Sequence, residues 1–517
     1  MTETGSATMY TPPTLAELGR VHFIGMGGAG MSAIARIMVG QGLAVSGSDA
    51  KDSAGLSQLA TLGATVYVGQ AAANVAAVDT VVVSTAIRED NPELLAARAA
   101  GLRVLHRSEA LAAAMADDTV VAVAGTHGKT TTTSMITVML RGAGVDASFA
   151  VGGTVQGLGV NAAHGAAGVF VAEADESDAS FLNYRPKIAV VTNLEADHLD
   201  YYGTPEAVFA AFGQFVTLIP RDGTLVACAD DAGSADLAAR AAASGINTIT
   251  YGFAQDADVR LLPGSHDGLL TTASIVLQGS QATASMHDAE PGTLALRLQV
   301  PGNHNLSNAA AAVAVALALG VDTGLALTAL GTFSGAARRF EAKGVARGVA
   351  VYDDYAHHPT EVTAALLAAR TVAGAHKVHV LFQPHLFSRT AEFATEFAQA
   401  LDLADTVAVL DIYAAREDPV AGVSSELITR SLTKPFGYAP DPLAAVARLC
   451  QGAVAGDIIL TVGAGDVTEF GPILVATLAA FAVLAIAIDG VLALLQRAAV
   501  SPGLQTAKAA PSIEASP

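Results

Sequence analysis

The sequence is poor in the residues that build disulfide frameworks and aromatic binding surfaces. It has no tryptophan, 5% aromatic residues and two cysteines, Cys228 and Cys450, which lie far apart and match no disulfide or metal-ligand spacing. Basic residues are also scarce, with 28 Lys and Arg against 48 Asp and Glu, a formal net charge of −20. The cysteine count indicates a reducing compartment, and the charge argues against nucleic-acid binding, which needs clustered cations.

Small and aliphatic residues are abundant instead. The chain has 517 residues, of which 52% are hydrophobic and 50 are glycine. A prior of roughly 150 residues per domain predicts three domains. The abundance of alanine and glycine favours close packing of helices on sheets. The first 18 residues are polar and carry no targeting signal, so we expect them to be disordered.

The clearest chemical signal begins with a run of small apolar residues at 120–124, which predicts a buried strand. The strand is followed by the glycine-rich turn Gly125-Thr126-His127-Gly128-Lys129-Thr130-Thr131. Glycines let backbone N–H groups converge on an anion, the following helix adds partial positive charge, and Lys129 adds a full charge. Thr130 or Thr131 would place a hydroxyl on Mg²⁺. The spacing is shorter than the general phosphate-loop pattern, so an ordinary capped turn is the alternative.

A second glycine turn lies near the N-terminus, between a strand expected at 21–24 and a helix at 31–39. Its glycines are Gly25, Gly27, Gly28 and Gly30. A further strand at 44–48 ends at Asp49, which completes a dinucleotide fingerprint with the acid placed on a ribose hydroxyl. The turn amides suit any pyrophosphate, so NAD and a UDP-sugar both satisfy the pattern, and a plain βαβ turn is the alternative. Arg88, after a strand at 78–84, is a candidate phosphate contact.

Two acidic segments, 173–178 and 193–200, follow apolar strands downstream of the lysine-bearing turn. Ligands of open α/β sheets bind beyond the carboxyl ends of strands, so both segments should face that turn. Their carboxylates and one imidazole suit Mg²⁺ beside a triphosphate. Solvated acidic loops are the alternative.

Asn305 and Asn308 precede an alanine-rich helix expected at 309–319. Either residue could cap that helix. The functional alternative is that a carboxamide donates and accepts hydrogen bonds at an adenine edge.

A third block starts near residue 335, and its expected strands at 349–352, 378–382, 407–410 and 458–462 each end in polar residues. Several histidines and arginines crowd these strand ends. A single buried histidine is usually structural, but the group favours a second Rossmann-type sheet that faces the nucleotide site.

Taken in order, these stretches resemble the Mur ligases of peptidoglycan synthesis. The matching runs are HFIGMGGAGMSAIA, GTHGKTTTTSM, EADESDASFL, TNLEADHLDYY, GNHNLSNAAAA, ARRFE, DDYAHHPTE, FQPHLFSRT and VGAGDVT. Several motifs in one order, spread over residues 20–472, are far more specific than any one of them.

The resemblance implies a cytoplasmic, three-domain α/β enzyme. A Rossmann-like UDP-sugar domain would span 19–117, a P-loop ATPase-like domain 118–333, and a Rossmann-like amino-acid domain 334–472. The implied reaction uses ATP and Mg²⁺ to join L-alanine to the carboxylate of UDP-N-acetylmuramic acid through an acyl phosphate. A homodimer is compatible with this reading.

The resemblance also implies roles for particular residues. The catalytic positions are Lys129, His357 and Arg389. The ATP contacts are Gly125, Thr126, His127, Gly128, Lys129, Thr130, Thr131, Asn305, Arg339 and Asp354. The UDP-sugar contacts are Gly25, Gly27, Gly28, Gly30, Asp49, Arg88 and His127. The amino-acid and substrate contacts are Tyr355, His357, His385 and Arg389. The metal ligands are Thr130, Glu173 and His198.

The chain departs from its relatives at two positions. Ligases that add later residues often carry a carbamylated lysine where this chain has Phe212, which favours the alanine-adding branch. Leu386 stands where some relatives have arginine. A peptide-recycling ligase using the same nucleotide sugar is the nearest alternative. A NAD-binding regulatory protein would need a hydride acceptor site that the sequence does not supply, and a membrane-tethered scaffold is a third reading.

The tail, residues 473–517, opens with an apolar stretch to residue 495 that is interrupted by Asp489. The uncharged part, 473–488, spans about 24 Å as a helix, short of the roughly 30 Å hydrocarbon core. We expect a helix packed on the C-terminal domain and a disordered end at 501–517, and membrane contact through 473–495 is not favoured.

Overall fold

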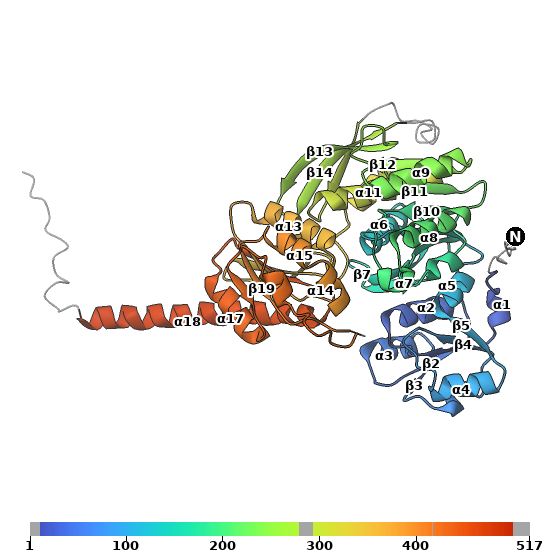
Figure 1. The fold of residues 1–517 in the computed structure, drawn as a ribbon, viewed down its shortest axis with the longest axis horizontal. Coiled ribbons are helices and arrows are strands. Elements are labelled where there is room, and N and C mark those ends of the chain that lie inside the picture. Colours follow the sequence, from blue (N-terminus) through green and yellow to red (C-terminus); the bar gives the residue numbers. More distant parts are fainter. Residues whose placement is uncertain (1–10, 279–292, 416, 500–517) are drawn as a thin grey trace, which may run out of the picture. The chain divides into compact units, whose positions relative to one another are not determined.

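The computed structural model describes residues 11–278, 293–415 and 417–499. It divides into two compact units that meet in sequence between Arg339 and Phe340. The first unit contains two sheets and the second contains one (Figure 1). These sheets and their helices confirm the predicted three-domain α/β architecture.

The N-terminal sheet is fully parallel, in the order β3-β2-β1-β4-β5. Its strands are β1 (Val21–Ile24), β2 (Val45–Asp49), β3 (Thr65–Val68), β4 (Thr80–Val83) and β5 (Arg103–His106). The helices between them are α2 (Ala29–Gly40), α3 (Ala54–Thr61), α4 (Pro92–Ala99) and α5 (Arg107–Ala114). The strand order reverses direction at β1, so the turn after β1 lies at the switch point where open α/β sheets bind ligands.

The central sheet is larger, in the order β15-β14-β13-β12-β11-β10-β6-β9-β7-β8. The strands nearest the lysine-bearing turn are β6 (Thr119–Ala124), β9 (Val169–Glu173) and β10 (Ile188–Val191). The others are β7 (Ser148–Val155), β8 (Val160–Ala163), β11 (Thr224–Cys228), β12 (Asn247–Gly252), β13 (Val259–Asp267), β14 (Leu270–Leu277) and β15 (Thr293–Leu298). Its helices include α6 (Lys129–Gly142), α7 (Leu199–Tyr202), α8 (Pro205–Thr217), α9 (Ala232–Ala243), α11 (Asn303–Leu319) and α12 (Thr323–Leu330).

The second unit is built on a sheet in the order β16-β17-β21-β18-β19-β20, parallel except for β16. Its strands are β16 (Glu341–Ala346), β17 (Val349–Asp354), β18 (Val378–Phe382), β19 (Thr406–Val409), β20 (Phe436–Tyr438) and β21 (Ile458–Val462). The helices are α13 (Pro359–Ala373), α14 (Phe387–Glu392), α15 (Ala394–Leu401), α16 (Glu426–Thr429), α17 (Pro442–Gly452) and α18 (Phe470–Ala499).

The structure corrects one expectation near the N-terminus. Residues Leu15–Leu18 form a short helix, α1, and not a disordered segment. Thr14 and Glu17 form a capping box at its start, and Leu18 is fully buried. Residues 1–10 of the expected disordered segment lie outside the described residues, as does the end of the chain from residue 500.

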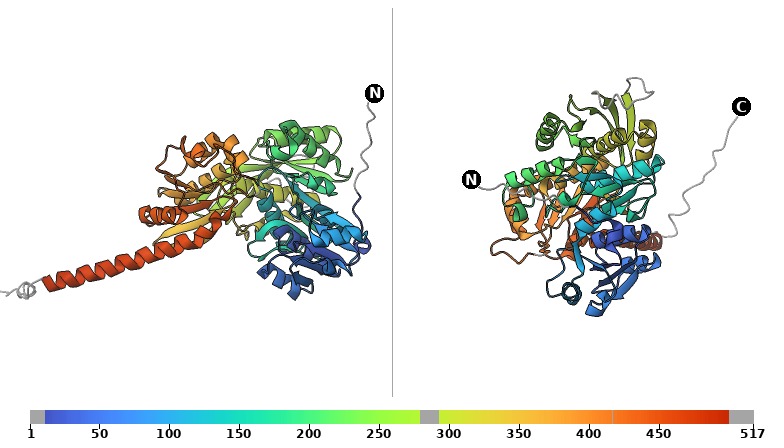
Figure 2. Two further views of the ribbon diagram at one scale, coloured as in Figure 1. Left: turned by 60° about the horizontal axis from the view of Figure 1, so that its bottom comes forward. Right: turned by 90° about the vertical axis from the view of Figure 1, so that its right-hand side faces the viewer.

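Helix α18 has two parts with different surroundings (Figure 2). Leu474 and Leu478 are fully buried in a cluster that includes Cys450 of α17, and Phe481 packs against it. Val483 is 68% exposed and Leu494 is 65% exposed. Among the described residues, one helical stretch, Asp466–Val483, which includes the start of α18, is long and apolar enough to cross a membrane, and 22% of it is buried. Core helices of soluble proteins pass the same test.

Candidate functional site

The glycine-rich segment of residues 125–129, here called the phosphate turn, links β6 to the start of α6 and depends on two glycines. Gly125 has a φ of 138° and Gly128 a φ of 81°, conformations that residues with a side chain rarely adopt. A Cβ atom on Gly125 would lie 2.0 Å from Oγ1 of Thr192. The close approach of β10 therefore requires glycine at this point.

Residues after β10 hold the phosphate turn in place. The His127 amide donates to Oδ1 of Asn193 at 2.7 Å, and the Thr126 amide donates to the Asn193 carbonyl at 3.2 Å. The Thr192 hydroxyl donates to the His127 carbonyl at 2.6 Å. Asn193 opens the strand-end segment predicted at 193–200, but no role of its own was predicted for it.

Lys129 is the first residue of α6, and its ammonium has three partners. Nζ donates to the carbonyls of Gly125 at 2.7 Å and Thr126 at 3.1 Å, and to Oε1 of Glu176 at 2.7 Å. Burial lowers the pKa of Lys129, but the neighbouring carboxylates, Glu176 foremost with Glu173 and Asp175, together raise that pKa overall. The lysine is therefore charged at neutral pH and lies within the phosphate turn.

The predicted metal ligands lie on segments that meet beside this lysine. The Thr130 hydroxyl donates to Oε1 of Glu173 at 2.9 Å, and Nε2 of His198 lies 3.4 Å from Oε1 of Glu176. Oε2 of Glu176 is buried with no hydrogen-bond partner among the described residues. A hydroxyl, carboxylates and an imidazole are donors that suit Mg²⁺, so this set fits the ion.

The two asparagines of α11 lie inside the helix and not at its cap. The helix begins at Asn303 after Gly302, so the capping explanation for Asn305 and Asn308 is wrong. Nδ2 of Asn305 donates to the Pro301 carbonyl at 2.7 Å. A Cβ atom on Gly128 would lie 3.0 Å from Oδ1 of Asn308, which places this helix against the phosphate turn. Adenine contact by Asn305 stays a prediction, as do the ATP contacts of Thr131 and Arg339.

The turn after β1, here called the N-terminal turn (residues 25–28), is held by a carboxylate. The Gly27 amide donates to Oδ2 of Asp49 at 2.9 Å, and a Cβ atom on Gly27 would lie 2.8 Å from the same oxygen. Asp49 therefore shapes the turn, and its predicted ribose contact would share this carboxylate. The Arg88 side chain is 86% exposed and pairs with Asp90 at 3.6 Å, so its phosphate contact remains a prediction.

Arg107 connects the surroundings of the two turns and was missed by sequence reasoning. Nη2 donates to Oδ2 of Asp175 at 2.7 Å, and a Cβ atom on Gly30 would lie 3.9 Å from Nη1. Burial would raise the pKa of Asp175, but Arg107 holds that pKa at about 2. The two residues are 68 positions apart and belong to no shared motif, so only the fold reveals the pair.

The second unit brings together several of the predicted substrate residues at the carboxyl ends of β17 and β18. The His357 ring lies 5.3 Å from the Tyr355 ring and 5.7 Å from the His385 ring, centroid to centroid. His385 in turn stacks on Tyr413 at 5.8 Å, a contact that the sequence did not predict.

Charged residues lie beside this aromatic cluster and affect the pKa of His357. Burial lowers the pKa of His357 despite the nearby Glu361, and the charge of Arg389 adds to that lowering. Arg389 is 8% exposed and lies on α14. The carboxylate of Asp354 accepts hydrogen bonds from the amides of Phe340 and Ala356, both at 2.8 Å, and so holds the backbone after β17 in place. The ATP contact of Asp354 stays a prediction.

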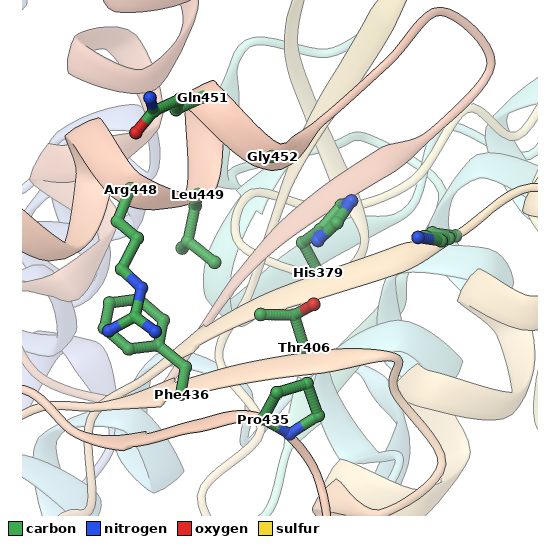
Figure 3. Close-up of a pocket in the computed structure, with 9 residues that line it drawn as sticks. His379, Thr406, Pro435, Phe436, Arg448, Leu449, Gln451 and Gly452 are labelled. Atoms are coloured by element: carbon green, nitrogen blue, oxygen red, sulfur yellow. The ribbon is translucent and has the colours of Figure 1, made fainter.

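A pocket of about 370 Å³ lies near the amino ends of strands in the same sheet, away from the carboxyl ends that carry the aromatic cluster (Figure 3). His379 and Thr406 lie near the amino ends of β18 and β19, and the Arg448 guanidinium lies over the Phe436 ring at 4.0 Å. None of the predicted site residues lines this pocket. The candidate site is therefore built from strand-end loops and not from this cavity.

Three family models match successive parts of the chain. The Mur ligase family catalytic domain matches residues 20–119, and the Mur ligase middle domain matches residues 123–316. The Mur ligase glutamate ligase domain matches residues 338–465.

Similar proteins agree with these models. The UDP-N-acetylmuramate–L-alanine ligase of Renibacterium salmoninarum is 63% identical over 90% of this chain and 97% of its own length. That of Paenarthrobacter aurescens is 61% identical over 90% and 98%.

Solved structures are similar as well. The UDP-N-acetylmuramate-alanine ligase of Thermotoga maritima is 29% identical with a TM-score of 0.72, over 88% of this chain and 98% of that one. A murein peptide ligase from Psychrobacter arcticus is 27% identical with a TM-score of 0.63, over 89% and 99%. The chain therefore belongs to the Mur ligase family of ATP-dependent ligases.

Proposed function

We propose that this enzyme joins L-alanine to the carboxylate of UDP-N-acetylmuramic acid, with ATP converted to ADP and phosphate. The observation that carries the proposal is the presence in one unit of two glycine turns, of which only one holds a lysine, and the side chain of that lysine is 16% exposed. Relatives that are 61–63% identical over nearly their full length bear the name of this activity.

ATP is assigned to the phosphate turn. The substrate carboxylate attacks the γ-phosphorus, ADP leaves, and an acyl phosphate forms. Negative charge spreads over the phosphoryl oxygens in this step, and Lys129 with the N-terminus of α6 is placed to stabilise it. Mg²⁺, held by Thr130, Glu173 and His198, would supply further charge neutralisation.

The UDP-sugar is assigned to the N-terminal turn. Gly25, Gly27, Gly28 and Gly30 leave room for a pyrophosphate at the start of α2. Asp49 fixes the turn through the Gly27 amide. Because this turn carries no lysine, it suits a phosphate group that is bound and not transferred.

L-alanine is assigned to the cluster of Tyr355, His357, His385 and Arg389. The amine attacks the acyl carbon, and phosphate leaves the tetrahedral intermediate. Burial keeps His357 neutral, so its imidazole can accept a proton from the attacking amine. Arg389 supplies a cation for a carboxylate. Closure of the domains must align amine and acyl carbon.

The proposal includes the cytoplasm as the place of action. The two cysteines are buried free thiols, as expected of a reducing compartment. A homodimer is compatible with the reaction, and membrane contact through residues 473–495 is not needed for it.

The test is ADP release by the full-length enzyme with UDP-N-acetylmuramic acid and a panel of acceptors: L-alanine, glycine, L-serine and one L-alanine-containing tripeptide. We expect the highest kcat/KM with L-alanine and no release without the nucleotide sugar. A preference for the tripeptide would contradict the proposal and favour a peptide-recycling ligase.

A further inference from the structure

The lysine of the phosphate turn has no donor left for a phosphate. An ammonium group has three N–H donors. In Lys129 these face the Gly125 carbonyl at 2.7 Å, the Thr126 carbonyl at 3.1 Å and Oε1 of Glu176 at 2.7 Å. A direct bond from Nζ to a nucleotide phosphate therefore requires one of these partners to leave.

Glu176 is the partner that can leave. The two carbonyls belong to the turn itself, which is fixed from the other side by Thr192 and Asn193. Glu176 comes from a different segment, three residues after β9. Its carboxylate would also repel an incoming phosphate, because two anions cannot share one buried cation without a penalty.

The surroundings of Glu176 allow its side chain to move while its backbone stays. The Tyr202 hydroxyl donates to the Glu176 carbonyl at 2.5 Å, which anchors the main chain to α7. Nε2 of His198 lies 3.4 Å from Oε1 of Glu176, so a second cationic or donor group is already beside the carboxylate. Glu176 is 2% exposed, and its Oε2 has no hydrogen-bond partner among the described residues. One oxygen is thus unsatisfied in the observed arrangement.

We propose that Glu176 is an exchangeable internal counter-ion: it neutralises Lys129 while the phosphate turn is empty and releases the lysine to the nucleotide. Glu176 is then a positioning residue that opposes nucleotide binding and stabilises the empty enzyme. The inference rests on the nucleotide site proposed above. Because Oε1 of Glu176 lies beside both Lys129 and His198, a movement of this side chain would change the surroundings of both residues.

The direct test is calorimetric titration of the full-length enzyme with ADP in the presence of EDTA. Glu176→Gln keeps the size of the side chain and removes its charge. We expect the ADP Kd of this variant to be about ten-fold lower than that of the wild type. If the wild type binds no ADP, the nucleotide site itself is wrong. If it does bind ADP and the variant binds no more tightly, only the exchange is wrong.

Asp178→Asn is the matched control, because it removes one carboxylate from the same segment. Oδ1 of Asp178 accepts from the Ser180 amide, and no contact joins it to Lys129 in the described structure. We expect this variant to change the ADP Kd by less than about two-fold. An equal gain in both variants would show a general charge effect and would overturn the proposal.

Adding Mg²⁺ separates exchange from metal binding. If Glu176 were a Mg²⁺ ligand, Glu176→Gln would have the same ADP Kd as the wild type in EDTA. In that case Mg²⁺ would no longer increase the affinity of the variant for ADP. That pattern would overturn the proposal, whereas tighter binding already in EDTA supports it.

Thermal unfolding supplies a second readout. The empty Glu176→Gln variant should melt below the wild type, because Lys129 loses its buried anion, and saturating ADP should raise its Tm by more than it raises that of the wild type. If Glu176→Gln does not fold, Glu176→Asp, which withdraws the carboxylate by one methylene, should show a smaller gain of the same sign. Lower stability with no increase in the ADP-induced shift would mean a merely structural role.

Discussion

The N-terminal turn and the phosphate turn have the same backbone plan and different electrostatics. Each follows a central strand of a sheet, begins with a glycine at positive φ (78° at Gly25 and 138° at Gly125) and opens a helix. A carboxylate holds the first turn by accepting the Gly27 amide. In the second turn a buried carboxylate, Glu176, pairs with the partly buried Lys129.

This difference indicates which chemistry each turn can support. Backbone amides and a helix N-terminus are enough to bind a phosphate that does not react. Negative charge builds up on a phosphoryl group during its transfer. A fixed cation stabilises this charge better than water does, because water molecules must first reorient. Under the proposed assignment, the lysine marks the turn where phosphoryl transfer takes place, and the other turn binds the substrate's phosphates without reacting with them.

The largest effect is expected from Lys129→Ala. Removal of the lysine ammonium from the phosphate turn should raise the activation free energy for ADP release by several kcal/mol. The expected fall in kcat is therefore more than ten-fold. Lys187→Ala is the control. The side chain of Lys187 is 36% exposed and pairs with Asp222 at 2.5 Å, away from the phosphate turn. Retention of more than about a tenth of wild-type kcat by Lys129→Ala would remove the distinction between the turns.

Gly27→Ala tests the N-terminal turn. The new Cβ atom would meet Oδ2 of Asp49 at 2.8 Å, so the turn must shift. We expect KM for UDP-N-acetylmuramic acid to rise by about ten-fold, roughly 1.4 kcal/mol, while KM for ATP stays within two-fold. Gly55→Ala is the control in the same domain, because its Cβ atom would lie 3.8 Å from Oγ of Ser53, an ordinary contact. Equal increases in both KM values would show that the two turns are not separate sites.

The smallest effect concerns the ion pair between the surroundings of the two turns. The pKa of Asp175 is held at about 2, below its usual 3.8, so its pairing with Arg107 adds stability above pH 3.8 that is lost as the pH falls toward 2. Arg107→Ala should lower the free energy of unfolding at pH 7 by about 1 kcal/mol, since the pair is partly exposed, and the difference from the wild type should shrink near pH 2. Chemical denaturation at several pH values measures this. A difference that grows as the pH falls would contradict the assignment.

The parts of the site that the sequence predicted are those where one short segment carries both the fold signal and the chemistry. Lys129 lies directly after a strand and two glycines, and the structure places its ammonium in the turn. The strands themselves were predictable because buried parallel strands read as continuous apolar runs.

The parts that the sequence could not predict depend on contacts between distant segments. Arg107 and Asp175 are 68 positions apart, and Lys129 and Glu176 are 47 positions apart. The start of α11 was placed too late because asparagines are poor helix formers, and here Asn305 is held inside the first turns by its bond to the Pro301 carbonyl. Helix α1 was missed although Thr14 and Glu17 carry a capping-box pattern, because a helix of four residues is too short to show an apolar periodicity.

The most direct test of two separate nucleotide sites is calorimetric titration of the wild-type enzyme with UDP-N-acetylmuramic acid, first alone and then in saturating ADP. The account predicts one molecule bound per chain in both titrations, with no competition, and no binding of NAD. Competition between the two ligands, or micromolar binding of NAD with none of UDP-N-acetylmuramic acid, would contradict it.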